Sequence, residues 1–230
     1  MRVAMVSGAN RGIGLAVARE LKAAGFALSL GVRRPEGAPA ELSQGGDALV
    51  HRYEATDRSS ARAWVEATAA RFGRIDALVN NAGIAPQVRL EDGAEEDLDA
   101  LFDVNVKGPF RLIQAALPHL KASGAGRVVN VASLSGKRVM GLNVGYQMSK
   151  HAVVALTHGV RRLGWEHGIR ATALCPGYVD TDLTAQVQDL PHEEMTRPED
   201  LARIVALVLQ LPNNAAIAEV LVNCRYEHML

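Results

Sequence analysis

Short apolar stretches alternate with longer amphipathic stretches from one end of the chain to the other. The apolar stretches are rich in β-branched residues and predict seven strands: Arg2–Val6, Ala27–Val32, Ala48–Glu54, Asp76–Asn80, Arg127–Ala132, Arg170–Cys175 and Glu219–Val222. The amphipathic stretches predict five helices: Gly12–Ala24, Ser59–Phe72, Glu95–Lys121, Gln147–His167 and Pro198–Leu211. Several strands are apolar on both faces, which is typical of a parallel sheet covered by helices on each side. The pattern predicts one doubly wound α/β domain over residues 1–230.

Two turn-rich stretches, residues 35–46 and 179–197, interrupt this alternation. The second runs into Thr196-Arg197-Pro198-Glu199, where Thr196 and Glu199 fit a capping box and predict the start of the last helix. Residues 179–197 are therefore expected to form a bounded loop. Because this loop follows the sixth strand of a doubly wound fold, we expect it to contact the substrate.

Composition weighs against several classes of partner. The chain has 25 Lys and Arg residues and 25 Asp and Glu residues, and this balance argues against nucleic acid or an anionic membrane as the main partner. No apolar stretch approaches the roughly 18 residues that a membrane-spanning helix needs, and no secretion signal is recognisable. Cys175 and Cys224 form no CxxC pair, and the seven histidines show no metal-binding spacing. We expect a cytoplasmic protein without a metal site.

A glycine-rich turn, Ser7-Gly8-Ala9-Asn10-Arg11-Gly12-Ile13-Gly14, follows the first strand. Glycines there allow a tight turn and close approach of a pyrophosphate, and the helix start offers free N–H groups to the anion. Such glycines alone often mark a plain turn, but here they join an N-terminal strand to an amphipathic helix. We therefore expect a dinucleotide to contact Gly8, Asn10, Arg11, Gly12, Ile13 and Gly14.

The second strand ends in Arg33 and Arg34, without the acid that usually holds the adenosine ribose in NAD sites. Guanidinium groups bind phosphate well, and Arg11 could add a further cation. The alternative is that Arg33 and Arg34 only solvate the end of a strand. The pattern favours NADP(H) over NAD(H), and the missing acid also weighs against an S-adenosylmethionine-dependent methyltransferase.

Tyr146 and Lys150 are four residues apart and share one face of a helix. Hydride transfer to a carbonyl needs a proton donor for the developing alkoxide, and the reverse reaction needs a base. A free Tyr has a pKa of about 10, and a nearby positive charge favours the tyrosinate. Tyr146 is therefore the predicted general acid/base, with Lys150 as its electrostatic partner. Ser133 follows the fifth strand, where its hydroxyl could hold the substrate oxygen.

These motifs follow one another in an order similar to that of the short-chain dehydrogenases/reductases. Further matches are Asn80-Asn81-Ala82-Gly83, Asn105 and Pro176-Gly177-Tyr178-Val179-Asp180-Thr181, and together the matches cover most of the chain. The resemblance implies a Rossmann fold with strand order 3-2-1-4-5-6-7 and helices on both faces of the sheet. It also implies a homodimer or homotetramer, built through the two longest helices.

The same resemblance assigns roles to individual residues. Asn105 would be a fourth catalytic residue that supports a water-mediated proton relay behind Lys150; the alternative is an Asn that packs against a neighbouring backbone. Lys150 would also bind the nicotinamide ribose, and Glu54 stands where the family has an acid near the adenine. Together with Tyr146 and Lys150, the cofactor contacts implied outside the glycine turn are Glu54, Ala55, Asn81, Ala82, Gly83, Pro176, Gly177, Val179 and Thr181.

The sequence therefore predicts an NADP(H)-dependent oxidoreductase that interconverts a small-molecule carbonyl compound, a ketone or aldehyde, and an alcohol. Two alternatives stay open. One is a protein that senses NADP(H) without turnover, although such proteins commonly lose the Tyr or the Lys. The other is a 3-oxoacyl-(acyl carrier protein) reductase, which would call for a basic surface to dock an acidic carrier; the neutral net charge gives it no support.

Overall fold

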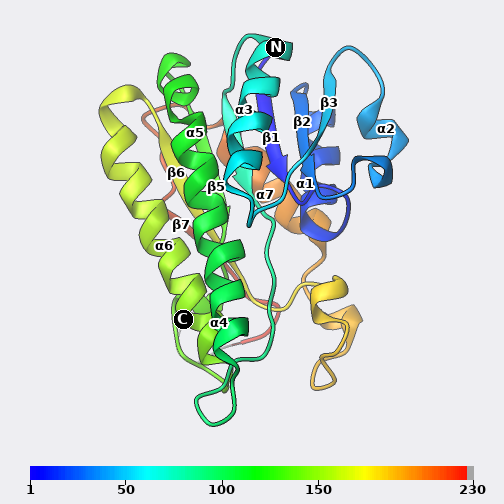
Figure 1. Cartoon of the computed structure of the whole chain (residues 1–230), viewed down its shortest axis with the longest axis vertical. Coiled ribbons are helices and arrows are strands. Elements are labelled where there is room, and N and C mark those ends of the chain that lie inside the picture. Colours follow the sequence, from blue (N-terminus) through cyan, green and yellow to red (C-terminus); the bar gives the residue numbers. More distant parts are fainter. Residues whose placement is uncertain (227–230) are drawn as a thin grey trace.

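Seven parallel strands form one sheet in the order β3-β2-β1-β4-β5-β6-β7 (Figure 1). The computed structural model describes residues 1–226 of the chain. The strands are β1 (Val3–Ser7), β2 (Ala27–Val32), β3 (Ala48–Arg52), β4 (Ala77–Asn80), β5 (Arg127–Val131), β6 (Arg170–Pro176) and β7 (Glu219–Val222). Every predicted strand is present, with its ends within two residues of the prediction, and the predicted strand order is confirmed.

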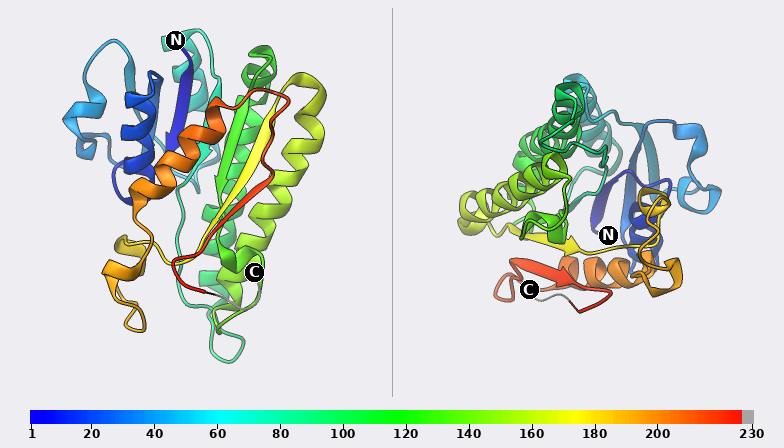
Figure 2. Two further views of the ribbon diagram at one scale, coloured as in Figure 1. Left: turned by 180° about the vertical axis from the view of Figure 1, so that it is seen from behind. Right: turned by 90° about the horizontal axis from the view of Figure 1, so that it is seen from below.

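Helices cover both faces of the sheet (Figure 2). One core lies between the sheet and helices α1 (Gly12–Ala23) and α7 (Pro198–Gln210). A second core lies on the opposite face, under α3 (Arg58–Phe72), α5 (Gly108–Ala122) and α6 (Val144–Gly164). Strands β1, β2, β4 and β5 are buried along their whole length because both faces are covered, which explains why they lack apolar–polar alternation. The predicted doubly wound α/β fold is confirmed.

The stretch predicted as one helix over Glu95–Lys121 has three parts. Helix α4 (Glu95–Leu101) runs into a π-helical turn over Phe102–Lys107, and α5 continues from Gly108. A π turn inserts one residue into the α-helical spacing and commonly occurs at functional sites. Here it carries Asn105, which is buried.

One predicted helix start and one predicted helix cap are wrong. Helix α6 begins at Val144 rather than Gln147, because the Asn143 side chain accepts a hydrogen bond from the Tyr146 N–H and caps the helix. The predicted capping box at Thr196 is absent, and α7 begins at Pro198 with no side-chain cap. Thr196 instead forms a parallel bridge with Val179. Its backbone N–H and carbonyl groups are hydrogen-bonded to residues 178 and 180 rather than to the helix.

The turn-rich stretches contain short helical elements. Residues 35–46 hold a 3₁₀ turn, η1 (Pro35–Gly37), and α2 (Ala40–Ser43), whereas residues 179–197 hold two 3₁₀ turns, η5 (Asp182–Thr184) and η6 (His192–Glu194). The remaining 3₁₀ turns are η3 (Leu134–Gly136) and η4 (Trp165–His167). Within residues 1–226, no helix combines the length and apolar character needed to cross a lipid bilayer.

Candidate active site

The glycine turn between β1 and α1 is shaped by positions that exclude side chains. Gly8 and Gly12 have φ angles of 68° and 52°, which favour glycine. A Cβ on Gly14 would lie 2.5 Å from Nδ2 of Asn81 and closer still to the carbonyl oxygen of Gly8. Asn81 Nδ2 donates hydrogen bonds to the carbonyl oxygens of Ser7 and Gly8, at 3.0 and 3.2 Å. The residue that follows β4 therefore supports the turn through hydrogen bonds, and the turn exposes backbone atoms at its glycine positions.

The predicted residues after β4 also contact this turn. The N–H groups of Asn81 and Ala82 both donate to Ser7 Oγ, at 3.0 and 3.1 Å. Gly83 is close to the catalytic candidates, because a Cβ there would lie 3.2 Å from Asn105 Oδ1 and 3.8 Å from Lys150 Nζ. The small residues at the end of β4 thus join the phosphate-binding turn to the predicted catalytic centre.

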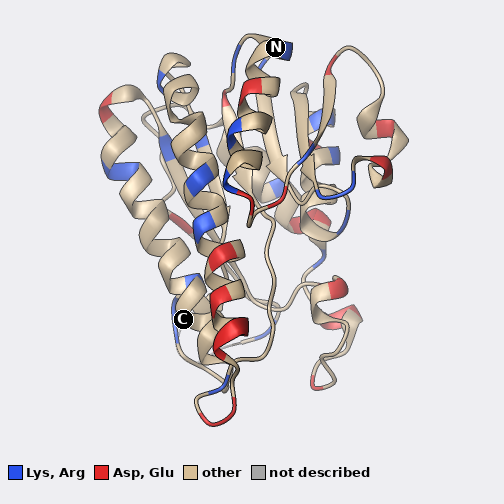
Figure 3. Cartoon of the chain, viewed as in Figure 1, with Lys and Arg blue, Asp and Glu red and all other residues tan. Residues whose placement is uncertain are grey.

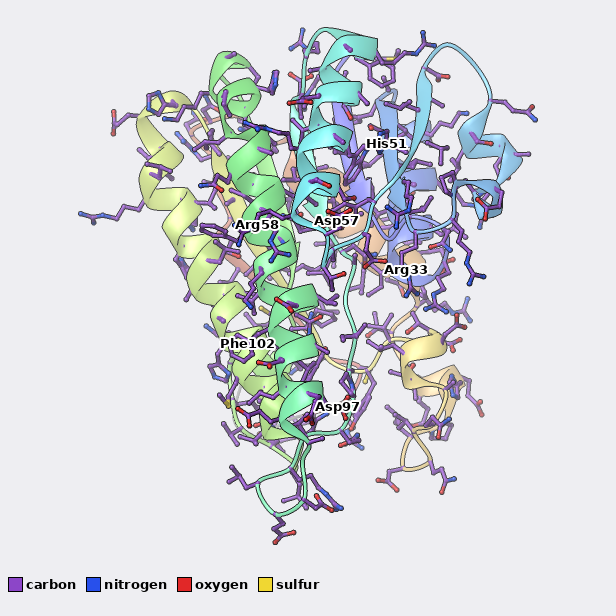
Figure 4. All side chains as sticks on the ribbon, in the orientation of Figure 1. Arg33, His51, Asp57, Arg58, Asp97 and Phe102 are labelled. Atoms are coloured by element: carbon purple, nitrogen blue, oxygen red, sulfur yellow. The ribbon has the colours of Figure 1, made fainter. Side chains whose placement is uncertain are left out.

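The cations predicted for a 2′-phosphate lie at the end of β2 and in the glycine turn. Arg33 and Arg34 are exposed, and Figure 4 shows Arg33 at the carboxyl edge of the sheet, with Asp57 and Arg58 at the head of α3 to one side. Arg11 points elsewhere, because its guanidinium Nη1 lies 2.9 Å from a carboxylate oxygen of Asp182 in η5. Of the three arginines, Arg11 alone thus has an acidic partner among the described residues.

The two residues predicted to contact adenine lie beyond the end of β3. The Glu54 carboxylate accepts a hydrogen bond from Thr56 Oγ1 at 3.4 Å, and its backbone N–H donates to Ser60. Ala55 is buried, and its carbonyl oxygen accepts a hydrogen bond from Arg111 of α5 at 2.9 Å. Glu54 and Ala55 therefore belong to the junction of β3 with α3 and α5, and no described contact joins them to the glycine turn.

Tyr146 and Ser133 meet at the carboxyl edge of the sheet. Tyr146 lies in the first turn of α6, and a hydrogen bond joins its side chain to that of Ser133, two residues past β5. Ser133 is nearly buried, and its Oγ accepts from the Ser135 N–H at 3.1 Å, which fixes the hydroxyl in place. Ser135 thus belongs to the turn, as its sequence position suggests. The two hydroxyl groups can contact one small polar atom together.

Lys150 lies one helical turn after Tyr146 on the same face of α6. Its side chain is 7% exposed, its Nζ donates to the carbonyl oxygen of Val131 at 3.0 Å, and it lies 5.5 Å from the centre of the Tyr146 ring. Burial lowers the pKa of Lys150 to about 8. Burial also raises the pKa of Tyr146 to about 12, although the hydrogen bond from Ser133 opposes this shift. The lowered pKa of Tyr146 expected beside Lys150 is therefore not found, because burial raises this pKa.

Asn105 is held by three hydrogen bonds in the π turn. Its Oδ1 accepts from the Ile84 N–H at 2.9 Å, and its Nδ2 donates to the Ile84 carbonyl oxygen at 3.0 Å and to Ser149 Oγ at 3.1 Å. These bonds tie the segment after β4 to the helix that carries Tyr146 and Lys150. The side-chain amide is thus engaged by the protein itself, which supports a positioning role for Asn105.

The residues after β6 lie beside the same centre. The carbonyl oxygen of Pro176 is 3.4 Å from Ser133 Oγ, and the Gly177 N–H donates to Val222 of β7. Thr181 approaches the glycine turn, since a Cβ on Gly12 would lie 3.2 Å from its methyl group. The structure therefore brings the β4, β5 and β6 ends, the glycine turn and the start of α6 together.

Three residues at this edge were not predicted from the sequence as site residues. Asn143 caps α6 and also bonds the backbone of Pro86 and Val88, so it fixes the turn that carries Tyr146. Its position three residues before Tyr146 is an N-cap signal that the sequence contains. Ser149 and Asp182 offered no such signal, because their partners are 44 and 171 residues away.

Acidic residues are frequent on α4 and on the loop 179–197 (Figure 3). They come from the segment before α4, from α4 itself and from the loop 179–197: Glu91, Asp92, Glu95, Glu96, Asp97, Asp99, Asp180, Asp182, Asp189, Glu193 and Glu194. The basic residues of the same segments are only Arg89 and Arg197. In a chain with no net charge, these segments thus carry an excess of acidic residues.

A family model described as short chain dehydrogenase matches residues 2–191. The chain belongs to this family. An agropine synthesis reductase of Rhizobium rhizogenes is 38% identical over 227 residues, which are 98% of this chain and 53% of that protein. The chain therefore spans about half the length of this relative.

Two solved structures are similar over nearly their whole length. One is an alcohol dehydrogenase from the archaeon Thermococcus sibiricus in complex with 5-hydroxy-NADP, at a TM-score of 0.89 and 31% identity, covering 99% of this chain and 98% of that one. The other is a 3-ketoacyl-(acyl-carrier-protein) reductase from Brucella melitensis in complex with NADH, at a TM-score of 0.89 and 27% identity, covering 97% of each chain.

Proposed function

We propose that this protein interconverts a ketone or aldehyde and an alcohol with NADP(H), and that Tyr146 is the general acid/base. The observation that carries the proposal is the hydrogen-bonded pair of Tyr146 and Ser133 at the sheet edge, with the buried Lys150 5.5 Å from the tyrosine ring. Family membership and the nicotinamide complexes of the two similar structures support it.

The residues of the glycine turn fit a dinucleotide. Because side chains are sterically excluded at Gly8 and Gly14, backbone N–H groups at the start of α1 are left to face a phosphate. The ends of β4 and β6 would hold the rest of the cofactor, through residues 81–83 and through Pro176, Gly177, Val179 and Thr181. When bound there, the nicotinamide ring supplies or accepts the hydride.

The protein's own groups handle the proton and the substrate oxygen. In reduction, Ser133 and Tyr146 hold the carbonyl oxygen, and Tyr146 Oη gives its proton to the alkoxide as it forms. A pKa of about 12 keeps the Tyr146 hydroxyl protonated at neutral pH, as a donor requires. Lys150, protonated below a pKa of about 8, stabilises the tyrosinate that is left. In alcohol oxidation the same groups act in reverse.

Oxidation of NADPH that depends on an added ketone or aldehyde tests this proposal. Binding of NADPH without turnover across a broad carbonyl panel would support the cofactor-sensing alternative instead.

The acidic residues of α4 and of the loop 179–197 weigh against the acyl-carrier alternative, because an acidic carrier protein would be repelled there. Within the panel, neutral and cationic carbonyl compounds are therefore expected to be better substrates than anionic ones.

Preference for NADP(H) is predicted to depend on Arg33. The exposed guanidinium at the end of β2 has no described acidic partner and is available to a 2′-phosphate. Arg33→Ala should weaken NADPH binding about tenfold or more, the usual scale for a lost charge-assisted hydrogen bond, and should leave the Kd for NADH almost unchanged. Isothermal titration calorimetry with both cofactors measures the two effects.

The matched control is Arg62→Ala, which removes an exposed arginine from α3 that pairs with Glu66. This variant should change neither dissociation constant. If Arg33→Ala weakens NADH and NADPH equally, or if the native protein prefers NADH, the assignment of Arg33 to the 2′-phosphate is wrong.

A further inference from the structure

The loop 179–197 is attached to the glycine turn at two neighbouring points. Arg11, which stands at the N-cap position of α1, forms an ion pair with Asp182 at 2.9 Å. Next to it, Gly12 lies against the methyl group of Thr181, where even a Cβ would be crowded at 3.2 Å. The two segments are about 170 residues apart in the sequence, so only the fold brings them together.

The loop end that carries Asp182 is well ordered by its own hydrogen bonds. Thr181 and Thr184 form a capping box around η5, and Thr184 Oγ1 also donates to the Val179 carbonyl oxygen. Val179 in turn forms a parallel bridge with Thr196 at the other end of the loop. These contacts within the loop therefore hold the Asp182 carboxylate in position beside Arg11.

The ion pair with Asp182 engages Arg11, a cation that could otherwise bind the 2′-phosphate of the cofactor. Arg11 is one of the three arginines that the sequence offers for the 2′-phosphate of NADP(H), and it alone is held by a carboxylate among the described residues. Both side chains are largely exposed, at 64% and 72%. An exposed pair of this kind is worth only about 0.2–1 kcal/mol, so a phosphate group with about two negative charges can compete for Arg11.

We propose that Asp182 tunes the selection of NADP(H) by competing with the 2′-phosphate for Arg11. This inference rests on the proposed function, because it assumes that NADP(H) binds at the glycine turn. Asp182 acts through Arg11 and is a positioning residue. Since the coupling is reciprocal, a 2′-phosphate on Arg11 weakens the attachment of the loop by the same factor by which Asp182 weakens NADPH binding. Recognition of the cofactor is thereby linked to the loop that we expect to contact the substrate.

Asp182→Asn tests the competition without adding bulk. The variant should bind NADPH more tightly, by up to about fivefold at low ionic strength, which is the scale of an exposed ion pair. NADH, which lacks the 2′-phosphate, should bind with an unchanged Kd. Calorimetric titration of the full chain with each cofactor measures both constants without turnover.

Asp180→Asn is the matched control. Asp180 lies on the same loop and carries the same charge, but its carboxylate pairs with His192 at 2.7 Å instead of with Arg11. Removing its charge should leave the NADPH affinity almost unchanged. Equal tightening by Asp180→Asn and Asp182→Asn would show a general effect of loop charge and would overturn the proposal.

The Arg11→Ala background separates competition from simple repulsion between Asp182 and the phosphate. If Asp182 acts through Arg11, Asp182→Asn should have no effect on NADPH binding once Arg11 is absent. The same tightening with and without Arg11 would overturn the proposal, as would no tightening in the native background. If the native protein does not bind NADPH at all, the proposed function fails rather than this inference.

Discussion

Tyr146→Phe is expected to lower kcat for carbonyl reduction by about three orders of magnitude, within the range for loss of a positioned general acid. The substitution keeps the ring, which lies 5.5 Å from Lys150 Nζ, and removes only the hydroxyl that is hydrogen-bonded to Ser133. Without that hydroxyl, the proposed proton donor to the alkoxide is missing. Steady-state kinetics at saturating NADPH measure the loss, and calorimetry should give a Kd for NADPH within about twofold of the native value.

Tyr53→Phe provides the matched control for this prediction. Tyr53 is buried in the core under α3 and α5, and the substitution removes the same kind of group, a phenolic hydroxyl. Its kcat should stay close to that of the native protein. A Tyr146→Phe variant that reduces carbonyls at near-native rate would show that the proton comes from another group.

Lys150→Met is expected to stabilise the ligand-free protein at pH 7 by about 2 kcal/mol, while turnover is lost. Burial lowers the pKa of Lys150 from 10.5 to about 8, which corresponds to a cost of roughly 3 kcal/mol for keeping the buried cation. Methionine fills a similar volume without charge. The lost hydrogen bond to the Val131 carbonyl oxygen offsets about 1 kcal/mol of the gain.

The pH dependence of this gain has a definite sign. Below pH 8 the lysine is protonated in both the folded and the unfolded chain, so the full cost is present. Between pH 8 and 10.5 the folded chain releases the proton first, and the cost shrinks until both forms are neutral. The advantage of Lys150→Met should therefore be largest at pH 7 and fade toward pH 10.5.

Urea unfolding of the native protein and the variant at several pH values measures this difference. A Lys150→Met protein that is less stable than the native chain at pH 7, or a difference that does not change with pH, would contradict the buried charge. The result also bears on function, because it would show that the fold accepts a loss of stability to keep a cation beside Tyr146.

The sheet could be predicted from the sequence because its signals are local. Each strand is a short apolar stretch, and the glycine turn, the Tyr146–Lys150 spacing and Ser133 are all read within a few residues of an element. The strand order came from resemblance to a family, and the structure bears it out. Asn143 carries a local N-cap signal as well, but the sequence prediction began this helix at Gln147 and did not use it.

Other features depend on contacts between distant segments and could not be predicted in this way. In the π turn, the Asn105 side chain forms hydrogen bonds with the backbone of Ile84 and with the Ser149 hydroxyl, which are 21 and 44 residues away. Thr196 has the sequence of a helix cap, but it pairs with Val179, and Arg197 takes the N-cap position of α7 instead. The raised pKa of Tyr146 likewise follows from burial, which residue spacing does not reveal.

Transfer of a labelled hydride tests the central claim most directly. The protein is incubated with a panel of ketones and aldehydes and with NADPH that carries deuterium at the transferable position of the nicotinamide ring, and the products are analysed by mass spectrometry. We predict that at least one product is an alcohol with deuterium on the former carbonyl carbon, formed by the native protein and about a thousandfold more slowly by Tyr146→Phe. Tight binding of NADPH with no deuterium in any product would contradict the proposed function.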